Sequence, residues 1–366
     1  MIDMTILRIV WAISAVLILL MLLMLFYLIE RKVRRTQHRA NVAEAVALLE
    51  GKDSPLGHYL ASGERSRSLT ASATGLRREA LEEALLDRLA ISASEVERQR
   101  VYELAADYFS EEYTELLSRR RWSERMNTLL HIEKFRIRRL KEPIIERLDV
   151  LGDRPDTDDE RFLLVRTLAS LQLEEMFDYF AIAEHRFSEL QLMQLLRPVR
   201  GELLDRLVRD FDRLPPRIAH CVLDTLRLGN IRTTEVLELL ERCLRSEDTE
   251  MRIRALKALA NFGYMNEETA DLLEERMQLG DSIAWPERLM QARLAGVVRE
   301  DRFAPYLEKM MADPAYEVRR EAGASLSKYR DGMDRIRLMT EEHTDRFARD
   351  MALETLERRA YERHVG

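Results

Sequence analysis

The side chains that could carry out catalysis are few and scattered in this chain of 366 residues. The two cysteines, Cys221 and Cys243, lack the spacing of a metal knuckle or a redox CxxC motif. His220 precedes Cys221, but adjacent residues on a helix do not face each other, so they make a poor base and nucleophile. The seven histidines form neither an HxxxH nor an HExxH motif. We therefore expect no metal site, and a reduced, packed thiol at Cys221.

Other catalytic signatures are missing from the sequence. It contains no Gly-rich phosphate loop, no G-x-S-x-G elbow and no kinase signature. The acidic loop 151–160 reads LGDRPDTDDE, which does not reproduce the EF-hand calcium pattern. Its aspartates are better explained as caps for a helix that begins near Glu160. We therefore predict that the chain is not an enzyme and needs no cofactor.

The composition favours a helical protein. Glycine and proline, the main turn formers, number only 13 and 9 among 366 residues. Residues that favour helices are abundant, and no segment shows the alternating pattern of a strand. The net charge of −7 does not supply the basic surface that nucleic acids require. These features predict an all-α chain with no nucleic-acid partner.

Two passages, 248–263 and 313–329, share one pattern. Each opens with an aspartate suited to cap a helix, continues with an apolar residue followed by Arg, and has Ala three positions after the arginine. Gly263 then suits a left-handed helix stop, and Pro314 suits the first helical position. The residues of the pattern are Asp248, Arg252 and Ala255 in the first copy, and Asp313, Pro314, Val318, Arg319 and Ala322 in the second.

This pattern resembles the HEAT repeat, including the HEAT-like repeats of phycobilisome lyase-type proteins. The D-P-x-x-x-V-R-x-x-A core matches best from Asp313 to Ala322, whereas Thr249 replaces proline in the first copy. A degraded copy at 281–296 has Arg288 where the small residue belongs. Clear resemblance covers roughly 215–331. It implies an α-solenoid of helical pairs, in which Arg252 and Arg319 bond the neighbouring repeat.

The uncharged run 9–29 predicts a membrane-spanning helix. As a helix it is about 32 Å long, enough to cross the hydrocarbon core of a bilayer. A signal peptide is the rival interpretation, but its apolar region is shorter and ends at small residues before a cleavage site. Basic flanks stay in the cytoplasm, so we expect a single-pass cell-membrane protein with its N-terminus outside and its solenoid inside. The basic flank consists of Arg31, Lys32, Arg34 and Arg35.

The chain is thus predicted to comprise five regions. They are a short extracytoplasmic N-terminus (1–8), the transmembrane helix (9–29), a basic juxtamembrane segment with a flexible linker (30–75), a helical region of degenerate repeats (76–213), and HEAT-like repeats with a C-terminal cap (214–366). The linker is placed at 51–75, where Gly, Pro, Ser and Thr concentrate.

The second helices of such repeats usually line the concave side of the solenoid, which makes them the predicted contact surface for a protein partner. A row of cations there favours an acidic partner segment. The candidate contact residues are Arg254, Lys257, Arg288, Gln291, Arg293, Arg320 and Lys328.

The predicted function is a bacterial-type, membrane-anchored cytoplasmic scaffold that binds membrane-associated proteins, such as an envelope complex containing a polysaccharide glycosyltransferase. Two alternatives stay open. One is a lyase-type enzyme, because the HEAT-like family includes bilin lyases; bound pigment in the purified protein would favour it. The other is a regulatory protein that senses a peptide or nucleotide ligand, which a thermal shift with candidate ligands would reveal.

Overall fold

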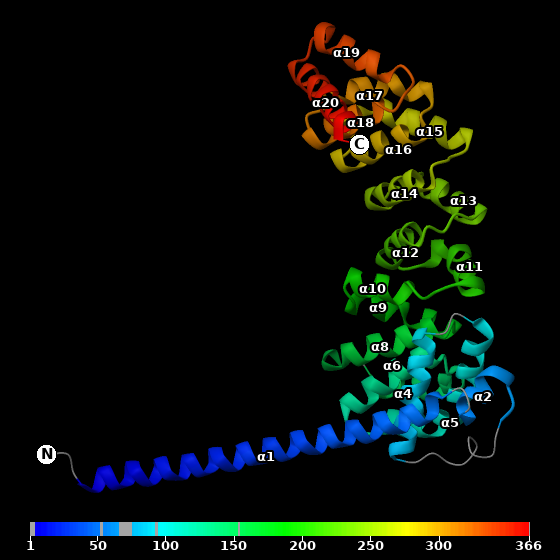
Figure 1. The fold of residues 1–366 in the computed structure, drawn as a ribbon. Helices are drawn as coiled ribbons and strands as arrows, with labels where there is room; N and C mark the ends of the chain where they lie inside the picture. The colour runs from blue at the N-terminus through cyan, green and yellow to red at the C-terminus, as the bar shows by residue number, and fades with distance from the viewer. Residues whose placement is uncertain (1–3, 52–53, 66–74, 92–93, 153, 366) are drawn as a thin grey trace. The chain divides into compact units, whose positions relative to one another are not determined.

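The computed structural model describes residues 4–51, 54–65, 75–91, 94–152 and 154–365, with the side chains of 4–10, 12, 14, 15, 50 and 363–365 outside the description. In the described residues the regular structure is entirely helical, which confirms the predicted all-α class (Figure 1). The chain divides into two compact units, Met1–Val150 and Leu151–Gly366. The boundary predicted between residues 213 and 214 separates degenerate repeats from clear HEAT-like repeats. It does not concern the two compact units, and it stays a prediction.

The first unit is built around the C-terminal part of a long helix, α1, which packs against α4. Val42 and Val46 of α1 are buried, and His38 Nε2 lies 2.6 Å from Glu79 Oε2 of α4. The helices of this unit are α1 (Met4–Glu50), α2 (Pro55–Ser62), α4 (Leu76–Ile91), α5 (Glu95–Ser118), α6 (Trp122–Phe135) and α7 (Lys141–Leu151), with the 3-10 turn η1 (Arg138–Leu140).

A cluster of hydrogen-bonded polar side chains lies inside the core of this unit. The Tyr113 hydroxyl donates to the Glu82 carboxylate, and His131 Nδ1 lies 2.6 Å from Glu82 Oε1. Burial alone would raise the pKa of Glu82, but the hydrogen bonds with His131 and Tyr113 outweigh it, so its pKa is lowered. The ring of Phe109 stacks on the ring of Tyr113, with centroids 5.4 Å apart, so an aromatic contact lies beside the polar one. The cluster therefore joins α4, α5 and α6 by hydrogen bonds as well as by packing.

The segment predicted as a flexible linker, 51–75, contains an ordered helix, so that prediction was wrong for its first half. The Ser54 hydroxyl accepts from the Gly57 amide and caps α2, and Pro55 occupies its first turn. Leu56 and Tyr59 of this helix are buried. Residues 66–74 of the predicted linker lie outside the described residues.

No helix that could cross a bilayer is found among the residues described with side chains. The predicted span, 9–29, begins at positions whose side chains lie outside that description. The span stays a prediction.

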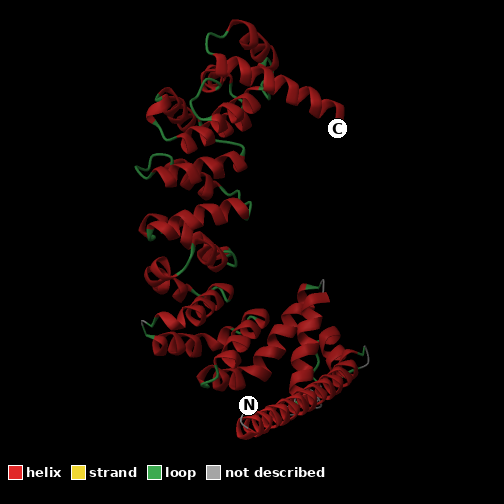
Figure 2. Ribbon diagram, turned by 90° about the vertical axis from the view of Figure 1, so that its left-hand side faces the viewer, coloured by secondary structure: helices red, strands yellow, loops and turns green. Residues whose placement is uncertain are grey.

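The second unit stacks pairs of helices in successive layers (Figures 1 and 2). In Figure 1 the first helices α11, α13 and α15 lie on one side of the stack, and the second helices α12 and α14 on the other. Helices α10, α12, α14, α16, α18 and α20 pack in series, each against the next, whereas α11 and α13 touch only lightly. This tighter packing places the second helices on the inner side of the layers.

The bounds of this unit's α-helices are α8 (Asp158–Ser170), α9 (Phe180–Arg186), α10 (Glu189–Leu196), α11 (Gly201–Arg209), α12 (Pro216–Leu228), α13 (Thr234–Cys243), α14 (Thr249–Phe262), α15 (Glu267–Gln278), α16 (Trp285–Val298), α17 (Ala304–Met310), α18 (Tyr316–Leu326), α19 (Gly332–Glu342) and α20 (Arg346–Val365). Its 3-10 turns are η2 (Pro155–Thr157), η3 (Glu174–Tyr179), η4 (Phe211–Arg213), η5 (Gly280–Ser282) and η6 (Asp301–Phe303).

Small residues set the spacing of α16 and α18. A Cβ added at Gly296 would lie 2.2 Å from Ser325 Oγ and 2.8 Å from Ser325 Cα, so only glycine fits there. Gly263 ends α14 with φ of 80°, as the sequence predicts. The repeat pattern thus specifies both where a helix stops and how closely the next one approaches.

Candidate functional site

An arginine near the start of several second helices turns back onto the preceding loop. Arg252 donates to the carbonyl oxygens of Ser246 and Glu247, both at 2.8 Å. Arg319 does the same at 2.7 Å to Asp313 and 3.1 Å to Pro314. Arg349 of α20, which the sequence did not single out, repeats the geometry on the carbonyls of His343 and Thr344. These guanidinium groups satisfy loop carbonyls and are structural in their placement.

Ion pairs made by Arg252, Arg276 and Arg288 link one helical pair to the next. The Arg252 guanidinium meets Glu287 of α16 through two N–H donors, at 3.0 and 2.8 Å, and Arg276 Nε lies 2.9 Å from the same carboxylate. Arg288 meets Asp313 through two donors at 2.6 and 2.8 Å. Glu287 is fully buried. The ion pairs therefore run through the interior of the stack rather than across its exterior.

Two predicted partner contacts are wrong on this evidence. Arg288 is 6% exposed and Gln291 is 0% exposed, so neither can reach a partner. The sequence placed Arg288 in the small-residue position, but its contacts are those of the capping arginine. Gln291, three residues later, takes the position held by Ala255 and Ala322. In this repeat the arginine therefore lies about three residues later than an alignment of 281–296 with 248–263 predicts.

The two cap aspartates differ from each other. Asp248 caps α14 by accepting from the Glu250 amide, as predicted. Asp313 accepts from the Ala315 amide, and α18 begins only at Tyr316. Pro314 therefore precedes the helix instead of occupying its first position. Val318 and the two repeat alanines, Ala255 and Ala322, are fully buried.

The predicted row of free cations is largely neutralised by internal ion pairs. Arg254 pairs with Asp224 at 2.5 Å, Glu250 at 2.7 Å and Glu189 at 3.2 Å. Arg293 pairs with Glu321 at 3.1 Å. Among the described residues, three of the predicted contacts form no ion pair and stay accessible or partly accessible: Lys257, Arg320 and Lys328.

The basic residues predicted to flank the membrane span lie exposed on α1, directly after the apolar run. Arg34 pairs with Glu30 one turn earlier, at 2.5 Å. Arg31, Arg34 and Arg35 line one side of the helix together with Tyr27. The four residues are Arg31, Lys32, Arg34 and Arg35.

Among the described side chains of the second unit, the thiols and histidines do not assemble into a catalytic group. His220 Nε2 lies 2.7 Å from Asp248 Oδ2 instead of facing Cys221. Burial would raise the pKa of Asp248, but the hydrogen bond with His220 helps to lower it. Burial raises the pKa of Cys221 to about 11 and that of Cys243 to about 12. At neutral pH both side chains are therefore uncharged thiols.

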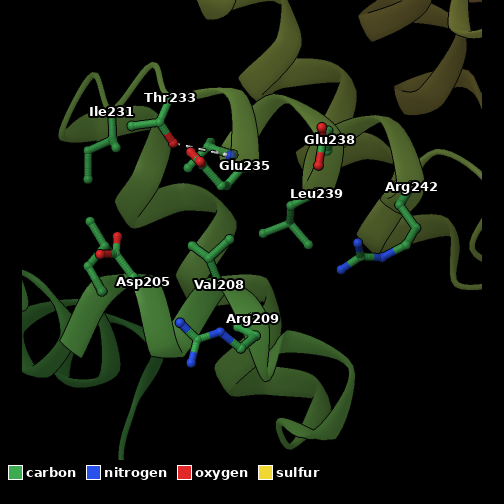
Figure 3. Close-up of a pocket in the computed structure, with 11 residues that line it drawn as sticks. Asp205, Val208, Arg209, Ile231, Thr233, Glu235, Glu238, Leu239 and Arg242 are labelled. Carbon is green, nitrogen blue, oxygen red and sulfur yellow. Dashed lines mark hydrogen bonds between the residues drawn. The ribbon is translucent and has the colours of Figure 1, made fainter. Parts of the chain in front are cut away.

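Two hollows lie between successive layers of this unit. The first, about 500 Å³, separates α11 from α13, and Figure 3 shows charged side chains of both signs around it. The second, about 450 Å³, lies between α10 and α12. The second contains exposed leucines, Leu190 at 66% and Leu228 at 61%, which the sequence did not single out. Their only sequence signal was their place on the polar side of each helix.

One comparison with known proteins, the family-model match, agrees with the repeat. Residues 202–284 match the family model of HEAT repeats. An engineered protein of known structure is 16% identical over 87% of this chain and 98% of its own, with a TM-score of 0.34. A chain from the structure of the Pds5–Scc1 complex is 12% identical over 87% of this chain and 59% of its own, with a TM-score of 0.32. No curated protein sequence matches. Residues 202–284, from α11 to the turn before α16, are thus similar to HEAT repeats, and the regular structure of the described residues is helical throughout.

Proposed function

We propose that this protein is a scaffold that binds other proteins along the second helices of its HEAT-repeat unit. The observation that carries the proposal is the unbroken series of second helices from α10 to α20, each packed on the next. Such a series presents one extended surface, and extended surfaces of this kind suit protein partners better than small substrates. The buried ion pairs Arg252–Glu287 and Arg288–Asp313 join neighbouring layers without using the residues at the exterior of that surface.

The accessible cations on this surface are the proposed contact points. Lys257, Arg320 and Lys328 come from α14, from α18 and from just after α18, and none is used in an ion pair within the described chain. Charged groups at the rim of an interface steer association more than they add affinity. We therefore expect salt to slow partner binding more than it accelerates dissociation.

The N-terminal part of α1 is proposed to hold the scaffold at a membrane. Apolar side chains from Val16 to Ile29 are exposed on this helix, for example Leu17 at 60% and Phe26 at 67%. A contiguous exposed apolar surface of this extent is unfavourable in water and suits lipid. The basic residues after it favour a cytoplasmic location for everything that follows. A partner in an envelope complex, such as a polysaccharide glycosyltransferase, is consistent with that placement.

Photo-crosslinking in cells tests the scaffold role. A photoreactive residue is introduced in separate full-length variants at Lys257, Arg320 and Lys328, and at Glu275 and Lys309 on the first helices as controls. We expect a defined protein adduct from the second-helix positions and none from the controls. Equal adducts at both sets, or none at either, would count against the proposed surface.

Fractionation tests the anchor separately. The full chain should stay in the membrane pellet after alkaline carbonate extraction, and a variant with Leu20→Arg and Leu23→Arg should be released. An alkaline phosphatase fused to the C-terminus should be inactive in intact cells, because that enzyme folds only outside the cytoplasm. An active fusion would contradict the proposed orientation.

A further inference from the structure

We propose that the hollow between α10 and α12 is a docking groove for a short partner segment that carries two apolar side chains and a carboxylate. This inference rests on the proposed scaffold role and names the place and chemistry of one contact. Helices α10 and α12 occupy successive layers of the second unit (Figure 1). The groove is lined by Leu190, Met193, Gln194, Arg197, Arg200, Thr225, Leu228, Gly229 and Ile231.

The groove gathers several exposed apolar side chains in one place, which is unusual for a surface in contact with water. Leu190 and Leu228 are each more than half exposed, at 66% and 61%, although they line the same hollow as Met193 and Ile231. Single exposed leucines are common and need no explanation. Four apolar side chains gathered around one hollow form a patch, and such patches mark interaction sites. A partner segment that places two apolar side chains here would remove both leucines from water.

A cation at the rim of the groove indicates which charge a partner would carry. Arg197 is exposed just after α10 and forms no ion pair among the described residues. Arginine binds a carboxylate through two parallel N–H donors, which makes it a specific contact for an acidic residue. The larger hollow between α11 and α13 carries charges of both signs, because Asp205 and Glu235 surround it together with Arg209 and Arg242 (Figure 3). Charge complementarity therefore favours an acidic segment at the α10–α12 groove.

The rim is already held in place before any partner binds. Gln172 donates to the Pro198 carbonyl at 2.8 Å and accepts from the Arg200 amide at 2.7 Å. The Arg200 guanidinium donates to the carbonyls of Arg197 and Val199. Gly229 has no side chain to fill the hollow at the end of α12. A preorganised rim lowers the entropy lost on binding, which favours a short peptide as occupant.

A peptide selection on the full chain in detergent tests the groove. A phage-displayed library of random peptides is selected on the wild-type protein, and the enriched peptides are measured by fluorescence polarisation. We expect enriched sequences that share two apolar residues and an acidic residue. Leu228→Glu should weaken their binding at least tenfold, and Arg197→Glu should weaken the acidic peptides while sparing variants in which the acid is replaced by Gln.

Matched variants separate the groove from general effects. Leu338→Glu introduces the same change at an exposed leucine of α19, and Glu238→Lys alters the α11–α13 hollow; both should leave peptide binding unchanged. The proposal is overturned if no shared pattern emerges, if peptides bind the Leu228→Glu and Leu338→Glu proteins equally, or if Leu228→Glu turns a dimer into a monomer. That last outcome, read by sedimentation, would assign the groove to a second copy of the chain. If cellular crosslinks persist unchanged in Leu228→Glu, the groove assignment falls while the scaffold role stands.

Discussion

The guanidinium of Arg252 and the carboxylate of Glu287 face each other across two layers of the stack, with N–H···O distances of 3.0 and 2.8 Å. They are 35 residues apart in sequence, and Glu287 is fully buried. A buried charge whose partner is removed loses its compensation, whereas an exposed pair contributes little. The arginine that identifies the repeat in the sequence therefore also joins α14 to α16.

Replacing Glu287 by Gln is predicted to destabilise the second unit by about 3–5 kcal/mol, because Arg252 and Arg276 would then face an uncharged amide. The measurement is urea unfolding followed by the fluorescence of Trp285, with Trp11 and Trp122 replaced by Phe so that one tryptophan reports. The matched control removes an exposed pair: Asp334→Asn, opposite Arg337, should change the free energy of unfolding by less than about 1 kcal/mol.

A second variant tests whether the pair is coupled. The double variant Arg252→Met and Glu287→Met should cost clearly less than the sum of the two single changes, because no unpaired charge from this pair is left inside. Additive losses would mean that the two groups contribute independently, contrary to the geometry.

Replacing Gly296 by Ala is predicted to destabilise the second unit by roughly 1–3 kcal/mol through overpacking. The new Cβ would lie 2.2 Å from Ser325 Oγ and 2.8 Å from Ser325 Cα, so α16 and α18 must move apart. Adding Ser325→Gly should restore only part of the loss, since the backbone contact persists. Thermal unfolding checks both variants. Gly51→Ala, whose Cβ would lie 3.9 Å from Ser54 Cβ, is the control, and full rescue by Ser325→Gly would refute the backbone contact.

Much of the repeat was predictable from sequence because it depends on local chemistry. Asp248 caps α14 and Gly263 ends it, and both are short-range features that the residue types predict. The pattern also located Arg252 and Arg319, but it assigned them to the neighbouring repeat and not to the loop carbonyls five or six residues earlier that both of them bond. The ends and spacing of these helices therefore needed no knowledge of the rest of the fold.

The partner surface could not be predicted in the same way because it depends on neighbours far along the chain. On its own helix Arg254 has Glu250 one turn earlier, yet its other carboxylate partners are Asp224 and Glu189 from earlier layers. Gln291 looks like a polar surface residue. In this repeat, however, the pattern is displaced by about three residues, and Gln291 therefore lies in the buried position. Helix α2 was missed for a different reason: glycine and serine content suggested a linker, although the Ser54–Pro55 start and Gly63 stop were readable as caps.

The Glu82 cluster predicts how the first unit responds to acid. Its folded pKa is lowered, so the ionised carboxylate contributes stability above the unfolded value near 4.5, and that contribution is lost as the pH falls through the folded pKa. Between about pH 5 and about pH 3 the wild type should lose more stability than Glu82→Gln. The Gln variant should also be roughly 1–3 kcal/mol less stable at neutral pH, because a weaker acceptor faces Tyr113 and His131.

The reporter for that experiment is Trp122 on α6, with Trp11 and Trp285 replaced by Phe, so that the transition of the first unit is followed. Glu83→Gln, an exposed neighbour on the same helix, serves as the control and should keep the wild-type pH slope. Identical slopes for Glu82→Gln and wild type would show that the cluster does not govern acid stability.

The two thiols are predicted to be inert in the folded protein. Burial raises the pKa of Cys221 to about 11 and that of Cys243 to about 12, so the reactive thiolate is scarce at neutral pH and shielded from reagent. At neutral pH Ellman's reagent should label the native chain at least roughly tenfold more slowly than the urea-unfolded chain. A Leu338→Cys variant supplies an exposed thiol that should react at once under the same conditions. Rapid labelling of two thiols in the native wild type would mean that α12 and α13 open far more readily than their packing implies, and that the second unit is not a rigid surface.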